Sequence, residues 1–193
     1  KVTGVQTCAL PILTAIGVNS WVSAAPTTLD EAYAQIVALG QAVGHEEEAT
    51  ELADSMRADI DSIVADATKV AEGTSYFLEL DDTLYSVTSN TFIGSLYELF
   101  GLRNIADATE GDTDYPQLSA EFIVSQDPDL IFLADTKCCG ASAETVAARP
   151  GWDVLSAVKA GHVVELDDDI ASRWGPRLVD YVAAIAAALE SLG

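Results

Sequence analysis

Basic side chains are scarce in this sequence. It holds 9 lysines and arginines against 31 aspartates and glutamates, so its formal net charge is −22 over 193 residues. A surface so rich in carboxylates repels nucleic acids and anionic membranes at long range, and no nucleic-acid partner is expected. The charge suits either a solvated surface adapted to solubility or high salt, or a surface on which some carboxylates dock a partner.

Long apolar runs are also missing. No run reaches the roughly 18 residues that a membrane-spanning helix needs, and the alanine-rich stretch 182–189 lies in an amphipathic pattern. Hydrophobic residues nevertheless make up 49% of the chain, and the mean hydropathy is +0.22. These values indicate a folded globular protein, long enough for one good core or two small ones.

Cysteine and histidine are few. The cysteines are Cys8, Cys138 and Cys139, and the histidines are His45 and His162. Neighbouring cysteines rarely bond to each other, because a disulfide favours a Cα separation larger than one peptide gives comfortably. Two cysteines without a nearby histidine make a poor zinc site, and two distant histidines do not predict a site for bare zinc or manganese. The adjacent pair of cysteines is left without an assigned role.

Motifs of nucleotide-binding and hydrolytic enzymes are absent from the sequence. There is no GxGxxG after the first strand of the α/β region, no GxxxxGK[ST] and no GxSxG. Cys138 or Cys139 could imitate a thiol–imidazole pair with His162, but a bare count of such residues is a weak signal. Catalysis is therefore not expected. An α/β enzyme of unknown substrate and an acidic partner-binding module remain as alternatives.

The beginning of the chain does not look natural. The run from Val2 to Ile12, VTGVQTCALPI, resembles the translation of a sequencing-library adaptor. Residues 1–12 are interpreted as an artefact and native sequence before about Leu13 is expected to be lost; an ordinary strand and turn around Pro11 is the alternative. Residues 13–25 predict a strand that ends in a loop closed by Pro26.

Two helices are predicted next. The motif Thr28-Leu-Asp-Glu31 matches a capping box that opens a helix running to about Gly40. A clean apolar period of three and four residues then runs from about 46 to 70, beginning with three glutamates where the helix dipole favours negative charge. At 1.5 Å per residue this helix would be roughly 37 Å long, enough to bridge two lobes. Packing along a single domain is the alternative.

From Thr74 onward, strands and helices alternate. Strands are predicted at 75–80, 103–105, 129–134 and 162–166, and helices at 91–100, 119–126, 142–148 and 175–192, with a short helical turn near 153–158. This alternation predicts an α/β fold with a doubly wound parallel sheet. Ligands of such sheets bind beyond the carboxyl ends of the strands, which here lead into loops rich in Asp, Ser, Thr, Tyr and Trp.

The ordered set of segments resembles a known family. TLDEAYAQIVALGQAVG is followed by the long helix, TFIGSLYELFGLRNI, YPQLSAEFIVSQDPDLIFL, RPGWDVLSAVKAGHVVELD and SRWGPRLVD. Over residues 13–193 this order is similar to the siderophore- and cobalamin-binding proteins of ABC importers, whose two α/β lobes are joined by a rigid helix. The resemblance implies a remnant of a first lobe at 13–44, a connecting helix at 45–72 and a C-terminal α/β lobe at 73–193, in a chain truncated at its N-terminus.

The resemblance also implies site residues. Glu121 matches the carboxylate that docks on arginines of the permease; the alternative is an acid that stabilises the helix dipole by ~0.5 kcal/mol. The loops predict ligand contacts from aromatic and charged side chains and, at Ser89, Asn90 and Thr91, from the backbone amides at the start of the 91–100 helix. These residues are Tyr85, Ser89, Asn90, Thr91, Tyr115, Asp169, Ser172, Arg173 and Trp174. The alternatives are an N-cap role for 89–91, loop packing for Tyr115, an ion pair with 167–169 for Arg173 and a half-buried indole for Trp174.

As a member of that family, the protein would be an extracytoplasmic receptor, lipid-anchored at full length, that hands a ferric siderophore or cobalamin to ABC permease subunits. No intrinsic cofactor and no metal ligands are expected, and a monomer is expected. One wall of a cleft buries only part of a ligand, so this chain should fold but bind weakly.

Overall fold

The structure is a computed structural model that describes residues 11–67, 69–171 and 173–192. Ser172 and residues 1–10 of the predicted artefact lie outside the described residues. The strand predicted over 13–25 is wrong: residues 11–15 form a helical turn, and 18–26 have no regular structure. Its apolar side chains Ile16, Val18, Trp21 and Val22 are all exposed, because no sheet edge lies beside them to pair with.

A parallel sheet of four strands forms the centre of the α/β region. The strands are β1 (Ser75–Glu79), β2 (Arg103–Asn104), β3 (Leu130–Leu133) and β4 (Val163–Glu165), in the order β2-β1-β3-β4. Tyr76 is paired with Asn104 on one side and with Leu130 on the other. The chain leaves β1 toward β2 and then returns past β1 to β3, so the carboxyl ends of β1 and β3 form the topological switch point of this doubly wound sheet.

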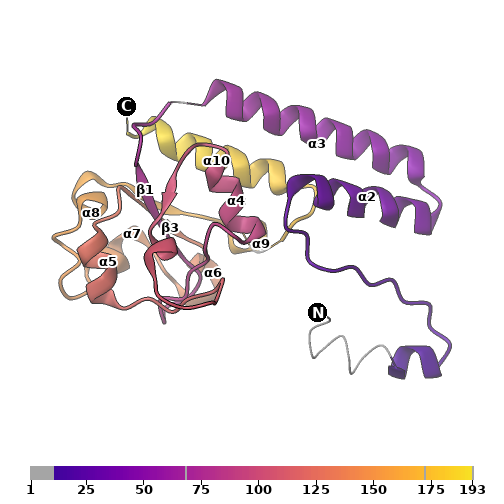
Figure 1. The fold of residues 1–193 in the computed structure, drawn as a ribbon, viewed down its shortest axis with the longest axis horizontal. Helices are drawn as coiled ribbons and strands as arrows, with labels where there is room; N and C mark the ends of the chain where they lie inside the picture. The colour runs from indigo at the N-terminus through magenta and orange to yellow at the C-terminus, as the bar shows by residue number, and fades with distance from the viewer. Residues whose placement is uncertain (1–10, 68, 172, 193) are drawn as a thin grey trace.

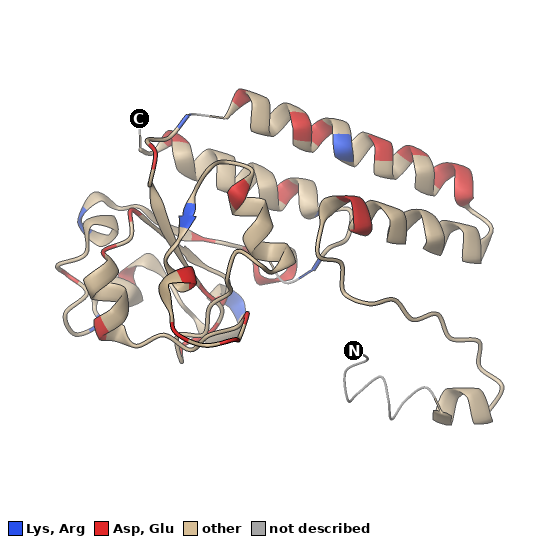
Figure 2. Cartoon of the chain, in the orientation of Figure 1, with Lys and Arg blue, Asp and Glu red and all other residues tan. Residues whose placement is uncertain are grey.

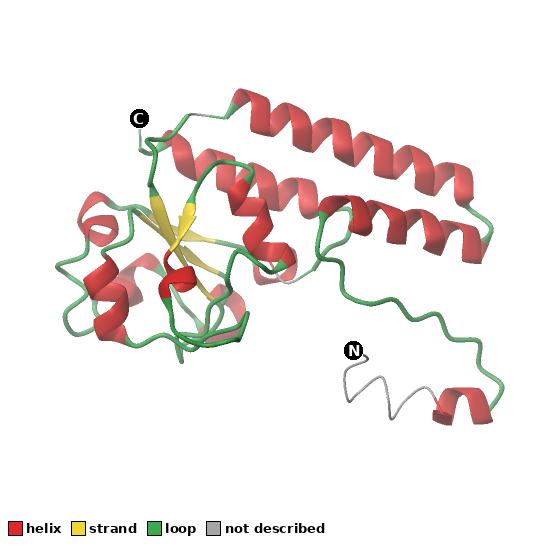
Figure 3. Ribbon diagram, in the orientation of Figure 1, coloured by secondary structure: helices red, strands yellow, loops and turns green. Residues whose placement is uncertain are grey.

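Helices cover both faces of the sheet (Figure 3). Because side chains on both faces of such a sheet are buried, its strands consist mostly of consecutive apolar residues. On one face, Tyr76, Leu78 and Phe132 pack against α4 (Phe92–Glu98) and α10 (Leu178–Glu190). On the other face, Phe77 and Ile131 share a core with Trp152 and residues of α5 (Ala120–Gln126), α7 (Ala143–Ala147) and α8 (Ser156–Ala160). The predicted α/β class and the alternation of strands with helices are confirmed.

The two predicted N-terminal helices are α2 (Leu29–Val43) and α3 (Glu46–Asp66). Thr28 caps α2 by accepting the N–H of Glu31 at 3.2 Å, whereas the Glu31 carboxylate reaches the N–H of Thr27 at 2.7 Å, one residue earlier than the capping box predicts. Gly40 lies against Ala49, where a side chain would collide, and this lets α2 and α3 approach closely.

Helix α3 ends at Asp66, earlier than the predicted end near residue 70. Its buried side chains Ala53, Met56 and Ile60 repeat at helical spacing and join the core that contains α2 and α10 (Figure 1). The helix is therefore packed on the α/β region along its middle turns. Its predicted role as a connection between two lobes stays a prediction.

Three short elements were not predicted. They are a 3₁₀ turn (Ile105–Ala108), α6 (Thr136–Cys139) and α9 (Asp168–Ala171). They have no more than four residues each, too short for a periodic pattern. Figure 2 shows that acidic residues are spread over the outer face of α3 and over the loops, with few basic residues between them.

Candidate ligand-binding site

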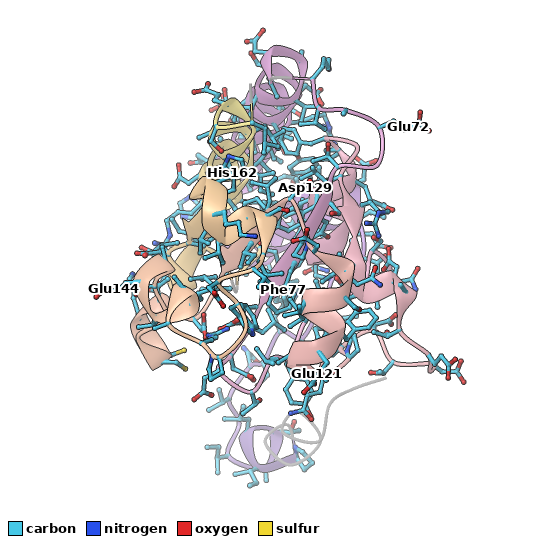
Figure 4. All side chains as sticks on the ribbon, turned by 90° about the vertical axis from the view of Figure 1, so that its left-hand side faces the viewer. Glu72, Phe77, Glu121, Asp129, Glu144 and His162 are labelled. Atoms are coloured by element: carbon cyan, nitrogen blue, oxygen red, sulfur yellow. The ribbon has the colours of Figure 1, made fainter. Side chains whose placement is uncertain are left out.

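The carboxyl edge of the sheet is where the predicted ligand contacts should gather. In Figure 4 the residues that precede strands, Asp129 and His162, lie above Glu121, which opens the helix before β3. The carboxyl edge therefore faces the lower end of that view. Because His162 precedes β4 while Cys138 and Cys139 follow β3, the parallel register separates them by the length of the strands. The thiol–imidazole pair considered from the sequence does not form.

Tyr85 and Tyr115 belong to two neighbouring segments of this edge. Ser86 N–H donates to the Pro116 carbonyl at 2.9 Å, and Tyr85 forms an antiparallel bridge with Gln117. Tyr85 and Tyr115 remain 40% and 54% exposed. Large apolar side chains that a fold leaves in solvent are available to a ligand, so both residues fit the predicted role.

Ser89 and Asn90 line an open cavity of about 610 Å³ next to the two segments. Its other polar walls include Asp107, Asp112 and Asp114. Both carboxylate oxygens of Asp107 accept hydrogen bonds from Ser89, one from the N–H at 2.8 Å and one from the hydroxyl at 2.7 Å. The hydroxyl of Ser89 is therefore already used within the protein, while Asn90 is exposed. Carboxylates dominate the charge of this cavity, a feature that the sequence reading did not assign.

Thr91 has the structural role considered as the alternative. It is buried, its hydroxyl oxygen accepts the N–H of Gly94 at 2.9 Å, and its hydroxyl donates to the Thr88 carbonyl at 2.9 Å. These bonds cap α4. The N-cap alternative is therefore present at Thr91, and its hydroxyl takes up the N–H of Gly94; binding of a ligand by the other N-terminal amides of this helix stays a prediction.

The loop before α10 brings a second aromatic group to the same place. Trp174 is 41% exposed, and its ring meets the ring of Phe92, the first residue of α4, edge to face with centroids 6.4 Å apart. The loop therefore lies beside the helix that Ser89, Asn90 and Thr91 open. Arg173 forms an exposed ion pair with Asp169 at 3.4 Å, as its alternative reading held. Asp169 also contacts the Lys137 ammonium at 3.3 Å.

Glu121 lies in the first turn of α5, which Ser119 caps by accepting the N–H of Phe122 at 3.1 Å. The side chain is exposed and lies at the lower end of the helix in Figure 4. Both interpretations of Glu121, docking to a permease and stabilisation of the helix dipole, require only an exposed carboxylate at this turn, so its position is compatible with either.

Sequence reasoning missed the polar contacts that fix α6 against α9. The Asp168 carboxylate accepts the N–H of Cys138 at 2.8 Å and the N–H of Lys137 at 3.0 Å. Although partial burial opposes it, these N–H donors lower the pKa of Asp168. The hydrogen bond from the Lys137 ammonium lowers the pKa of Asp167 and raises that of Lys137. Two cations of this edge, Lys137 and Arg173, are thus paired with aspartates, and a third, the exposed Arg177, donates to the Asp169 carbonyl at 3.3 Å.

A buried charged cluster lies just behind the edge. Arg149 donates to both oxygens of Glu79, at 2.5 and 2.6 Å, and Glu79 is fully buried at the end of β1. Asp135 is also fully buried, and neither of its carboxylate oxygens has a hydrogen-bond partner among the described residues. Burial first, and then the Glu79 charge, raise the pKa of Asp135 to about 7. A glutamate inside the apolar run SYFLEL was the sequence signal for this cluster.

Within the described residues, no group of three or more His, Cys, Asp or Glu side chains is placed to hold a metal ion. A search of the same part of the chain for a helix with the length and apolar character needed to cross a bilayer finds none. The candidate site is the set of exposed aromatic and carboxylate side chains at the carboxyl edge of the sheet, here called the ligand wall.

Comparison with known proteins supplies the family. A family model described as periplasmic binding protein matches residues 11–170. The chain is 32% identical over 163 residues to an uncharacterized ABC transporter substrate-binding lipoprotein, YvrC, of Bacillus subtilis. This alignment covers 82% of the chain and 50% of that protein. It is 32% identical over 185 residues to a cobalamin-binding protein of Halobacterium salinarum, covering 93% of this chain and 49% of the relative. The chain thus spans about half the length of these relatives.

Solved structures share the fold. A possible iron-binding, periplasmic solute-binding protein of Staphylococcus epidermidis superposes with a TM-score of 0.79 at 25% identity, over 95% of this chain and 70% of that one. A periplasmic heme-binding protein, RhuT, of Roseiflexus sp. RS-1 superposes with a TM-score of 0.81 at 21% identity, over 95% of this chain and 72% of that one.

Proposed function

The chain belongs to the periplasmic binding protein family, and from this premise we propose that it forms part of an extracytoplasmic solute-binding subunit of an ABC importer. Proteins of this family bind substrates for transport and are not a class of enzymes. The subunit would capture a metal chelate and deliver it to permease subunits. One relative is named a lipoprotein. We propose that the full-length form of this protein also carries a lipid anchor, on the outer side of the membrane.

One observation supports a ligand wall most directly. Three aromatic side chains, Tyr85, Tyr115 and Trp174, stay 40–54% exposed on loops at the carboxyl edge of the sheet, where doubly wound folds bind ligands. Exposed rings of this kind offer flat apolar surfaces and a polar edge to a ligand. The helix N-terminus behind them is already capped by Thr91, so recognition would come from side chains.

The charge of the wall favours one class of chelate. Asp107, Asp112 and Asp114 line the neighbouring cavity, and the cations Lys137 and Arg173 are paired with aspartates. An anionic ferric chelate would meet repulsion there, whereas a neutral or cationic flat chelate would not. We therefore favour a corrinoid over an anionic chelate such as ferric citrate. The Halobacterium salinarum relative is named a cobalamin-binding protein, and a Bacillus subtilis relative is named an Fe(3+)-citrate-binding protein.

Ligand titration tests this proposal. The chain should bind cyanocobalamin with a Kd of about 1 µM or weaker, because one wall covers only part of a ligand, and should bind ferric citrate more weakly still. Trp174→Ala should weaken corrinoid binding about 2- to 12-fold, since an aromatic contact is worth ~0.5–1.5 kcal/mol. Trp21→Ala is the matched control, because Trp21 is 48% exposed and lies outside the site.

Two results would contradict the proposal. Equal losses in the Trp174→Ala and Trp21→Ala variants would mean that the wall is not the binding surface. No saturable binding of either chelate up to ~1 mM would remove the support for a chelate receptor.

Docking to a permease would use Glu121. In the assembled importer, Glu121→Gln should reduce transport while leaving ligand affinity unchanged. Glu144→Gln is the matched control, because Glu144 is also an exposed acid in the first turn of a helix, α7. Equal transport by the two variants would leave Glu121 with only its contribution to the helix dipole.

A further inference from the structure

A buried carboxyl group directly behind the ligand wall has no part in the proposed function. Asp135, between β3 and α6, is fully buried, and neither of its carboxylate oxygens has a hydrogen-bond partner within the described residues. A buried carboxylate without a partner is strongly disfavoured, whereas a protonated carboxyl group is tolerated. Whether this group holds a proton therefore decides whether the edge of the sheet contains a buried unpaired charge.

The sheet register puts Asp135 beside a second buried carboxyl group. Glu79 is paired with Leu133 of β3, and its carbonyl accepts the N–H of Ala134 at 2.9 Å. Asp135 comes two residues after Leu133 and has a φ of −128°, so its side chain points to the same face of the sheet as those of Leu133 and Glu79. Side chains on one face of adjacent strands are close enough to interact.

Arg149 is the cation of this cluster, and Glu79 already holds it. Its guanidinium donates to both Glu79 oxygens, at 2.5 and 2.6 Å, and lies over the Trp152 ring, 4.6 Å from the centroid. Glu79 first, and then the charges of Asp135 and Asp82, raise the pKa of Arg149, so this side chain stays charged. A charge on Asp135 would compete with Glu79 for the same guanidinium.

The charged groups of the other elements around Asp135 are engaged elsewhere. Glu165, at the end of β4, accepts the N–H of the first residue of α7 at 2.8 Å. The Lys137 ammonium on α6 contacts Asp167 at 2.6 Å and Asp169 at 3.3 Å. Burial first, and then the Glu79 charge, raise the pKa of Asp135 to about 7, in agreement with this arrangement.

Asp135 is joined to the ligand wall through α6. Its carbonyl accepts the N–H of the last residue of α6 at 3.1 Å, which closes the helical turn. The N–H groups of Lys137 and Cys138, in the same helix, donate to the Asp168 carboxylate of α9 at 3.0 and 2.8 Å. From α9 the chain runs into the loop that carries Trp174. A movement of Asp135 therefore displaces α6 and strains the contact that positions this part of the wall.

We propose that Asp135 is a proton-controlled switch of the ligand wall. With its proton bound, the carboxyl group is neutral, and α6 stays packed against the sheet and bonded to α9. When the proton leaves to solvent, the buried charge competes with Glu79 for Arg149 and displaces the start of α6 outward, which opens the hydrogen bonds to Asp168. The effect on α6 is independent of the proposed receptor function, whereas the effect on ligand affinity rests on that function.

Amide hydrogen exchange on the full chain, measured by NMR, tests the proposal. The pKa of Asp135 is about 7 while α6 is packed, and it should return toward its ordinary 3.8 once α6 opens. Opening therefore becomes about 10-fold more favourable for each pH unit between these values. Protection of the Lys137 and Cys138 N–H groups, corrected for the intrinsic pH dependence of exchange, should fall by up to about 100-fold from about pH 5 to about pH 7 and then level off. In Asp135→Asn it should change by less than ~2-fold, because asparagine does not titrate.

Three controls separate this switch from a general effect of pH. The N–H of Phe122, which donates to Ser119 at 3.1 Å at the start of α5, should be equally protected in the wild type and in Asp135→Asn. Asp153→Asn replaces an exposed acid and should keep the wild-type pH dependence at α6. Glu79→Gln leaves Arg149 available to Asp135, so the fall in protection should shrink to less than ~10-fold.

The proposal is overturned if protection at Lys137 and Cys138 falls equally in the wild type and in Asp135→Asn, or if it does not fall in the wild type. Cyanocobalamin affinity is a separate readout. Weaker binding at about pH 7 than at about pH 5 in the wild type, but not in Asp135→Asn, would support the coupling to the ligand wall, and equal binding at both pH values would overturn that coupling. If cyanocobalamin does not bind at either pH while the exchange result holds, the receptor function fails and the switch at α6 stands.

Discussion

Asp135→Asn should make the protein more stable at high pH and leave its stability unchanged at low pH. Asp135 is fully buried, its oxygens have no hydrogen-bond partner among the described residues, and it shares its surroundings with Glu79 and Arg149. Arg149 is engaged by both oxygens of Glu79. A second carboxylate there has no cation of its own, so its neutral form is favoured.

The sign follows from proton linkage. The pKa of Asp135 rises from an ordinary 3.8 to about 7 in the folded state, so between these values the folded protein binds more protons than the unfolded chain. Stability therefore falls as pH rises through this window, by at most about 4 kcal/mol in total. Asparagine resembles the protonated carboxyl and does not titrate. The variant should equal the wild type near pH 4 and exceed it by up to about 4 kcal/mol at pH 8.

Urea unfolding at pH 4, 6 and 8 measures this difference. Asp153→Asn is the control, because Asp153 is exposed and its replacement changes the net charge by the same amount. A gain in Asp135→Asn that is equal at all three pH values, or a gain of the same size in the control, would refute the reasoning. Either result would mean that the charge itself, and not the burial of Asp135, determines the effect.

Three further predictions concern the core and the surface. Tyr97→Phe should cost about 1–3 kcal/mol by urea unfolding, because it leaves the buried Tyr181 hydroxyl without its 2.9 Å partner, and the double Phe variant should cost less than the sum of the single variants. Arg149→Ala should cost about 3–5 kcal/mol, since it leaves Glu79 buried without its cation; a cost below about 1 kcal/mol would contradict this. Raising NaCl from about 0.05 to 1 M should raise the thermal midpoint, because screening weakens repulsion within a chain of net charge −22, and an unchanged midpoint would show that this repulsion is minor.

Regular elements could be predicted because their residues repeat at a helical or strand period. The apolar runs around Phe77 and Ile131 are continuous, as parallel strands buried on both faces require, and the stripe Ala53, Met56 and Ile60 follows a helical period. The segment 13–25 carries a strand-like composition, yet a strand forms only where an edge is available for pairing. Composition alone cannot supply that partner.

The sequence predicted where the candidate site lies, but not the side-chain contacts that hold its residues in place. Topology places the segments that follow the four parallel strands at one edge, and exposed Tyr85, Tyr115 and Trp174 lie there. The pairing of Asp168 with the start of α6 joins residues about thirty positions apart, and the Glu79–Arg149 pair joins residues 70 positions apart. Such contacts depend on tertiary packing, and a single sequence carries no periodic signal for them.

The packing of α3 predicts where this protein can bend. Ala53, Met56 and Ile60 spread over two helical turns and are each at most 3% exposed in a core shared with α2 and α10. Bending α3 would separate these contacts, at a cost set by the apolar area lost, about 25 cal/mol per Å². Residues 18–26 have no regular structure and are exposed except for Ser23 and Pro26. Motion should therefore occur before Thr28, and hydrogen exchange should be slow across 53–63 and near the unprotected rate across 18–25. Fast exchange in the middle of α3 would place the hinge inside the helix and contradict this reading of its buried stripe.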